Sequence, residues 1–168
     1  FNIMIVRIRQ LMEQNTYEQE QKRLSELKAL QSQINPHFLY NTLDSIIWMA
    51  EGGKTKEVVL MTSSLARLLR QSISNEDELV SIKREVDYAR SYLTIQKMRY
   101  QDKMEFEIHV EEEILEQQII KLVLQPVVEN AIYHGIKYKD GKGLIKITGV
   151  HRSGCINLTV YDNGKGME

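Results

Sequence analysis

Apolar residues recur at every third or fourth position through the first part of the chain. No glycine interrupts residues 3–50, and polar side chains fill the opposite face from 13 to 28. This spacing lines the apolar side chains along one face of an α-helix, and the narrow stripe favours a coiled coil over a solvated surface helix. The stripe comprises Leu24, Leu27, Leu30 (or Gln31), Ile34 and Phe38.

A second helix follows a glycine turn. Gly52 and Gly53 end the first helix, because glycine readily adopts the left-handed conformation found at helix C-termini. Apolar spacing then predicts a helix to about Ser74, and so short a link makes the two helices an antiparallel hairpin. A single hairpin leaves one apolar side open, which two copies of the chain would close as a four-helix bundle. The second stripe comprises Val58, Met61, Leu65, Leu68, Leu69 and Ile73.

A mixed pattern begins at about residue 79. Alternating apolar residues predict strands, and apolar residues at helical spacing predict helices. Pro126 falls in the first turns of the last predicted helix, where proline is best tolerated. We therefore expect two layers, helices on a mostly antiparallel sheet, and an α+β fold class. The expected strands are 79–82, 105–110, 144–150 and 156–161, and the expected helices are 84–100 and 122–138.

Composition narrows the class of protein. A formal charge of −1 argues against nucleic acid as a partner. The single cysteine, Cys155, excludes an internal disulfide and fits a reducing compartment. No stretch reaches the roughly 20 apolar residues of a membrane-spanning helix. The chain opens on Phe1 and not on methionine, so we expect it to be part of a longer protein.

His37 directly follows a proline within the first predicted helix. Proline inside a helix costs about 3 kcal/mol, so Pro36 marks a strained position. A histidine there can be a buried structural residue, a metal ligand, a general base or a nucleophile. No other ligand residue lies at metal-binding spacing around it. Imidazole titrates near neutrality and attacks electrophiles directly, and Asn41 lies one helical turn further on the same face.

A second set of residues has the order of a nucleotide site. Glu129 and Asn130 lie on a predicted helix, His134-Gly135 follows one turn later, and Asp162 to Gly166 follows a strand. An amide oxygen binds Mg²⁺ without adding charge beside the phosphates. A carboxylate at a strand end accepts a hydrogen bond from the amine of adenine, and glycines let the backbone approach the base. Each piece alone also fits a turn, a helix end or a surface carboxylate.

Taken together, these segments closely resemble the LytS/YesM-type sensor histidine kinases. The resemblance rests on Gln33-Ile-Asn-Pro-His37-Phe-Leu-Tyr-Asn41, on Leu124-Gln-Pro-Val-Val-Glu129-Asn130-Ala-Ile-Tyr-His134-Gly135 and on Asp162-Asn-Gly-Lys-Gly166-Met. It implies an ATP-dependent protein-histidine kinase that uses Mg²⁺. Such a kinase phosphorylates its own histidine and passes the phosphoryl group to an aspartate of a response regulator.

The resemblance also assigns roles to individual residues. It makes His37 the phosphoacceptor, and Asn41 matches the position that assists phosphatase activity in related kinases. Asn130 becomes the Mg²⁺ ligand, and Asp162 the adenine-binding residue. The nucleotide site further includes His134, Gly164 and Gly166.

The same resemblance implies a domain organisation. Residues 1–16 resemble the end of a HAMP linker, and 17–78 a dimerisation and phosphotransfer hairpin. Residues 79–168 resemble the first part of a Bergerat-type (GHKL) ATP-binding sandwich, whose second glycine box would lie beyond Glu168. We therefore expect weak ATP binding by this chain alone. The implied protein is a homodimer, anchored in a bacterial membrane by preceding helices, and this chain belongs to its cytoplasmic portion.

Two positions depart from the common kinase pattern. Phe38 stands where most other histidine kinases place an acid as general base, which leaves Glu129 as our candidate base. Tyr133 stands where many members of the family carry a lysine that contacts phosphate. Lys137 or Lys165 would then supply the missing charge.

Two other functions compete with the kinase. The chain fits a non-catalytic coiled-coil module that dimerises and relays a signal through a degenerate nucleotide fold. It also fits an ATP hydrolase of the wider GHKL superfamily. Such hydrolases carry a water-activating glutamate four residues before the asparagine, and Pro126 occupies that position here, which argues against hydrolysis.

Overall fold

The computed structural model describes residues 12, 14–19, 21, 36–73 and 79–166. The chain divides into two compact units, Phe1–Tyr40 and Asn41–Glu168, and each is described by itself. Helix α2 (Pro36–Glu51) begins in the first unit and continues in the second. The expected stripe from Leu24 to Ile34, the helix through Pro36 and most of the HAMP-like segment lie outside the described residues.

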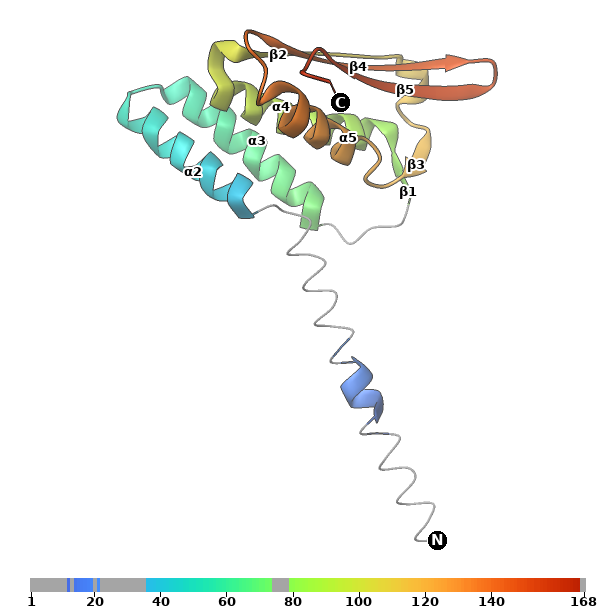
Figure 1. Ribbon diagram of the computed structural model, residues 1–168. Helices are drawn as coiled ribbons and strands as arrows, with labels where there is room; N and C mark the ends of the chain where they lie inside the picture. Colours follow the sequence, from blue (N-terminus) through green and yellow to red (C-terminus); the bar gives the residue numbers. More distant parts are fainter. Residues whose placement is uncertain (1–11, 13, 20, 22–35, 74–78, 167–168) are drawn as a thin grey trace, which may run out of the picture. The chain divides into compact units, whose positions relative to one another are not determined.

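A helical hairpin opens the second unit. From Asn41 onward, α2 runs beside α3 (Thr55–Ile73), as Figure 1 shows. The amide of Lys54 donates to the carbonyl of Met49 at 2.9 Å, and Gly53 has a φ of 69°, so the turn lies where the sequence predicted it. One face of each helix is buried. These buried residues are Thr42, Met49, Met61, Ser64, Leu65 and Leu68.

The main sheet has three strands in the order β2-β4-β5. Strand β2 (Met104–Val110) pairs parallel with β4 (Gly143–Arg152), which pairs antiparallel with β5 (Cys155–Asp162). The parallel pair requires a long crossover, and the helix that carries Asn130 lies within it. Ser153 and Gly154 make the predicted β4–β5 turn, with φ values of 53° and 76°.

A separate two-stranded pair joins β1 (Leu79–Ser81) to β3 (Gln118–Ile120) in antiparallel register. The sequence predicts β1. Strand β3 was not predicted, because three residues are too few to show an alternation of apolar and polar side chains. The expectation of a mostly antiparallel arrangement holds for two of these pairs, and β2–β4 is the exception.

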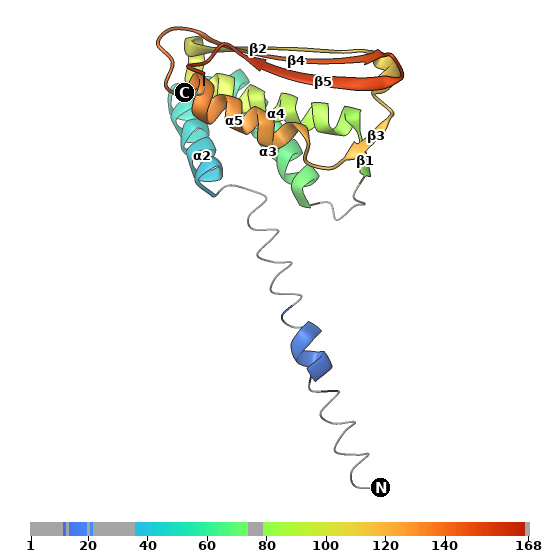
Figure 2. The same ribbon diagram turned by 45° about the vertical axis from the view of Figure 1, so that its right-hand side comes forward.

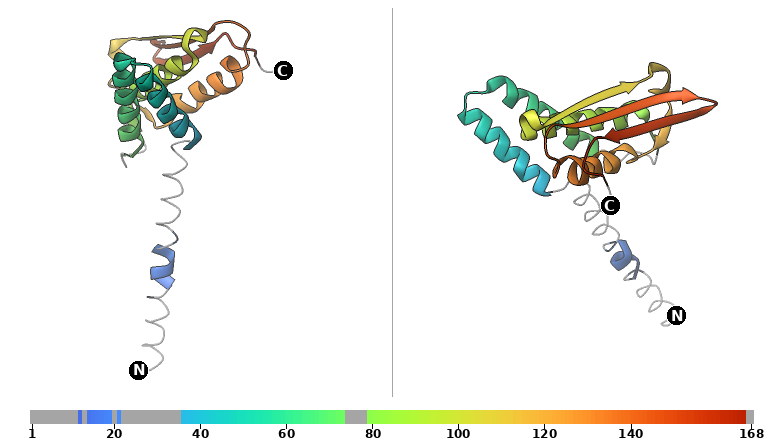
Figure 3. Two further views of the ribbon diagram at one scale, coloured as in Figure 1. Left: turned by 90° about the vertical axis from the view of Figure 1, so that its left-hand side faces the viewer. Right: turned by 45° about the horizontal axis from the view of Figure 1, so that its top comes forward.

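Two parallel helices cover one face of the main sheet (Figure 2 and Figure 3). The first is α4 (Ile82–Tyr100), whose first turn is capped by the hydroxyl of Ser81, which accepts a hydrogen bond from the amide of Arg84. The second is α5 (Leu124–Asn130), which continues as the π-helical turn η3 (Ala131–Ile136). Single 3₁₀ turns, η1 (Gln101–Lys103) and η2 (Glu112–Ile114), flank β2.

The core lies between this helix layer and the sheet. Its centre is formed by buried residues of α4, η2 and α5, and apolar side chains of the strands pack against them. The result is the expected α+β fold in two layers. None of the described helices is long and apolar enough to cross a lipid bilayer. The central residues are Ile82, Val86, Ile114 and Leu124.

Candidate functional site

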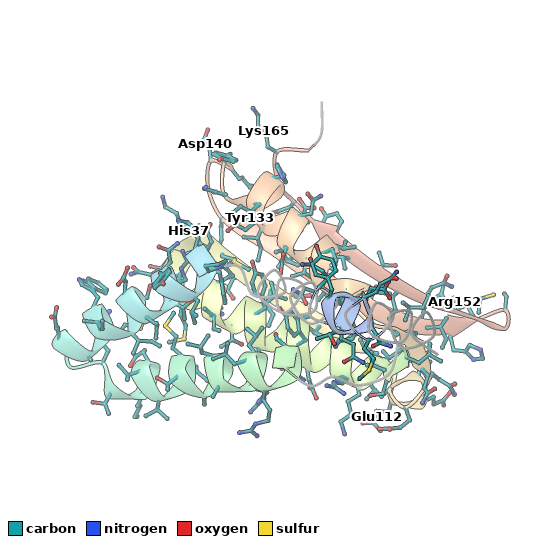
Figure 4. The ribbon with its side chains drawn as sticks, turned by 90° about the horizontal axis from the view of Figure 1, so that it is seen from below. His37, Glu112, Tyr133, Asp140, Arg152 and Lys165 are labelled. Carbon is teal, nitrogen blue, oxygen red and sulfur yellow. The ribbon has the colours of Figure 1, made fainter. Side chains whose placement is uncertain are left out.

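His37 lies in the first turn of α2 and is exposed, as are Pro36 before it and Tyr40 one turn later. Phe38, the next residue, is buried. Asn41 is half-buried, and its carbonyl accepts a hydrogen bond from the hydroxyl of Ser45 at 2.7 Å. Figure 4 labels His37 at the start of the helix. The remaining candidate residues belong to the second unit.

Asn130 ends α5 on the side of the helix that faces away from the core. Val128, Ala131 and Ile132 are buried around it, whereas Asn130 itself is exposed. His134 lies four residues later and is also exposed, so the two side chains share one face of the helix. Both side chains are therefore accessible to solvent.

Asp162 meets two glycines at the end of β5. The amide of Gly164 donates to Oδ1 of Asp162 at 2.9 Å, and the amide of Lys165 donates to the carbonyl of Gly135 at 3.2 Å. A Cβ atom on Gly135 would lie 2.5 Å from Oδ1 of Asp162, and one on Gly164 would also overlap Gly135. Glycine at both positions therefore lets the loop after β5 touch η3 directly beside the carboxylate of Asp162.

Asn163 holds this loop to the sheet. The backbone amide of Asn163 donates a hydrogen bond to the carbonyl of Leu144 at 3.1 Å. Its side-chain oxygen Oδ1 accepts a hydrogen bond from the backbone amide of Leu144 at 2.7 Å. The amine of Lys139 donates to the carbonyl of Asn163. The hydrogen bonds of Asn163 thus fix the position of the backbone next to Asp162. Gly166 follows with a φ of 79°, a conformation that favours glycine.

The side chain of Glu129 lies on a different side of the helix from that of its neighbour Asn130 and is half-buried. It accepts a hydrogen bond from Nε2 of Gln125 at 2.9 Å. Burial raises the pKa of Tyr88 and of Tyr92, both on α4, and the charge of Glu129 raises both pKa values further. The carboxylate therefore lies near these two phenols.

Glu85 positions the start of α5, a role that the sequence analysis missed. Its buried carboxylate accepts hydrogen bonds at 2.9 Å from the amides of Leu122, Val123 and Leu124. Leu122, whose amide forms one of these bonds, has a φ of 67°, in the left-handed region. One signal was available, because Glu85 falls in phase with the apolar positions of α4, where a charged residue needs a buried partner.

The residues present fit a magnesium nucleotide. Within the described residues, no three His, Cys, Asp or Glu side chains gather as a metal cluster. A cation at the exposed amide of Asn130 would therefore take phosphate and water oxygens as further ligands, which is the usual mode for Mg²⁺. The carboxylate of Asp162, at the end of β5, can accept a hydrogen bond from the amine of adenine.

Comparisons with known proteins agree with these motifs. The model of the histidine kinase family matches residues 25–104. The sensor histidine kinase YesM of Bacillus subtilis is 43% identical over the whole chain, which spans 29% of that protein. The sensor protein LytS of Oceanobacillus iheyensis is 33% identical over 90% of the chain, and the sensor histidine kinase YpdA of Escherichia coli is 36% identical over 89%. The chain spans 26% of each. It therefore belongs to the LytS/YesM-type sensor histidine kinases.

Proposed function

We propose that the chain is the core of a kinase that transfers the γ-phosphoryl group of ATP to His37. The bond from the γ-phosphorus to the bridging oxygen of ADP breaks, and a bond from phosphorus to a ring nitrogen forms. The group then passes to an aspartate of a response regulator. The exposure of His37 and the names of the relatives support this role.

The nucleotide would bind along the exposed face of α5 and η3. The observation that carries this proposal is the contact among Gly135, Asp162 and Gly164. Asp162 would accept a hydrogen bond from the adenine amine, and His134 and Gly166 would border the site. Mg²⁺ held by Asn130 would neutralise part of the phosphate charge.

The ring nitrogen of His37 that attacks phosphorus must be free of its proton. Glu129 is our candidate for the base, and its half-buried carboxylate is held by Gln125. If Glu129 is the base, Glu129→Gln slows the transfer about 100-fold or more, the usual range for a general base. The affinity for ATP should stay unchanged in that variant.

The parts of the chain fit one assembly. The hairpin within 17–78 would pair with a second copy as a four-helix bundle, and 79–168 would form part of a GHKL-type ATP-binding domain. Residues 1–16 would connect to a membrane-anchored sensor, with this chain on the cytoplasmic side. These proposals rest on the family membership and on exposed apolar residues of α2 and α3.

One experiment tests the phosphotransfer. The full-length protein is incubated with ATP labelled at the γ-phosphate, and acid-labile label on the protein is counted. We expect label in the wild type, none in His37→Gln, and strongly reduced label in Asp162→Asn. Label that persists in His37→Gln would contradict the assignment of His37.

The same samples separate the alternatives. A non-catalytic relay module predicts no label in any variant. A GHKL hydrolase predicts release of free phosphate that His37→Gln leaves unchanged. Pro126, which occupies the position of the water-activating glutamate, argues against hydrolysis.

A further inference from the structure

A row of four polar side chains lies along one face of α4, a helix that packs beside the start of α5 through the hydrogen bonds of Glu85. Tyr88, Tyr92, Gln96 and Arg99 follow at three- or four-residue spacing and so share one face of α4. Burial raises the pKa of Tyr92, and the nearby Glu129 and Tyr133 raise it further. Tyr92 therefore lies near α5 and η3, and its hydrogen bond with Gln96 links it to the end of α4 that carries Arg99.

Gln96 fixes the position of Arg99 within this row. The side chain of Gln96 is only 2% exposed, and its Nε2 donates to the hydroxyl of Tyr92 at 2.9 Å. Its Oε1 accepts a hydrogen bond from Nη1 of Arg99 at 3.1 Å. A buried amide with both ends engaged holds the guanidinium in one place, so little side-chain entropy is lost when an anion binds there.

The charge of Arg99 has no acidic partner within the described part of the chain. No carboxylate there forms an ion pair with it, and its hydrogen bond goes to a neutral amide. The side chain is half-buried, so the charge is only partly solvated. An oriented guanidinium in this state is suited to a phosphate, which it binds through two parallel N–H groups.

Two of the lysines near the site are already engaged. The amine of Lys137 lies 5.7 Å from the ring centre of Tyr133 and 5.3 Å from that of Tyr138. Lys139 donates to the carbonyl of Asn163. Tyr133 and Lys165 lie toward the same end of this unit as Asp140, and Arg152 lies at the other end (Figure 4). A triphosphate bound here would still have Lys165, and a cation from another element would add to it.

We propose that Arg99 contacts the phosphate groups of the bound nucleotide from α4, next to Tyr133. This inference rests on the proposed function, and it adds Arg99 to Lys165 as a source of the missing charge. Arg99 would recognise the triphosphate, whereas Asp162 would recognise the base.

The test compares ATP with adenosine, which has the base but no phosphate. Affinities of the full-length protein for both are measured with Mg²⁺ present, by calorimetry. We expect Arg99→Gln to weaken ATP binding about tenfold or more, as for loss of one charge-assisted contact, and to leave adenosine binding unchanged. Arg99→Lys should retain part of the affinity for ATP, because lysine keeps the positive charge but lacks the two parallel N–H donors of the guanidinium.

Arg90→Gln is the matched control. Arg90 is exposed on the same helix, nine residues earlier and therefore on the opposite side, and its loss changes the net charge equally. Its ATP affinity should equal that of the wild type. Thermal unfolding of each variant shows whether the fold is kept.

A second variant tests the proposal by a gain of binding. Adding Tyr133→Lys to Arg99→Gln should restore ATP affinity without changing that for adenosine, a result that misfolding cannot produce. Equal weakening of both ligands by Arg99→Gln, or no weakening, would overturn the role of Arg99 alone. A wild type that binds neither ligand would overturn the nucleotide site itself, and Arg99 with it.

Discussion

At the scale of single residues, the candidate site depends on two glycines, Gly135 and Gly164, as much as on its polar side chains. Asp162 lies against η3 only because Gly135 and Gly164 let η3 and the loop after β5 come together. The sequence predicted both glycines and the carboxylate as one motif. It did not predict that they touch, because their contact joins residues from different elements.

Gly135→Ala tests this contact. The new Cβ would lie 2.5 Å from Oδ1 of Asp162, so the loop must move away. We expect adenosine affinity to fall about tenfold and the free energy of unfolding to fall by about 1–3 kcal/mol, as for overpacking in general. Calorimetry and urea unfolding measure the two effects.

Gly52→Ala is the control for that substitution. Its Cβ would meet no atom closer than 3.5 Å. Adenosine affinity should be unchanged there, and equal affinities in the two alanine variants would contradict the proposed role of Gly135.

At the scale of elements, the N-terminus of α5 is set by a residue far away in the sequence. Glu85 on α4 accepts hydrogen bonds from three backbone amides at the start of the seven-residue helix α5. These amides have no acceptor within the helix itself. Helix boundaries were predicted well, because apolar spacing is a local property. The π-helical turn η3 was not predicted, since its apolar pattern resembles that of an α-helix.

Glu85→Ala leaves these amides without acceptors in a buried place. We expect the free energy of unfolding to fall by about 3 kcal/mol or more, because each unsatisfied buried group costs about 1–3 kcal/mol. Urea unfolding at pH 7 measures it. Glu112→Ala, at an exposed position, should change the free energy by less than about 0.5 kcal/mol. A similar small change for Glu85→Ala would show that water replaces the carboxylate.

At the scale of the whole molecule, the hairpin presents apolar side chains that are exposed among the described residues. On α2, Leu43, Ile47 and Trp48 are 42%, 56% and 58% exposed, and Val59 and Leu60 on α3 are 63% and 50% exposed. Residues of this kind on neighbouring helices are expected at a helix-bundle interface. The pairing with a second copy remains a prediction.

Ile47→Glu tests that pairing. A charge placed in an apolar interface should raise the dimer dissociation constant at least about 100-fold, since the carboxylate would lose its water without gaining a partner. Sedimentation velocity over a range of concentrations measures this. The control is Ile120→Glu on β3, a residue that is more exposed at 68%. A monomeric wild type, or an Ile47→Glu variant that dimerises as well as the wild type, would contradict the four-helix bundle.

The sequence by itself determined the types of element and the chemical motifs. Apolar spacing is a property of neighbouring residues, so the helices, three strands of the main sheet and the turns at Gly53 and Gly154 could be predicted. The motifs around His37, Asn130 and Asp162 were visible for the same reason.

Only the tertiary structure decided which distant segments meet. The parallel pairing of β2 with β4 and the bonds of Glu85 to amides 37–39 residues away both arise from packing. Such contacts depend on how whole faces fit together. No local pattern specifies them, because the same spacing is compatible with several arrangements of the same helices and strands.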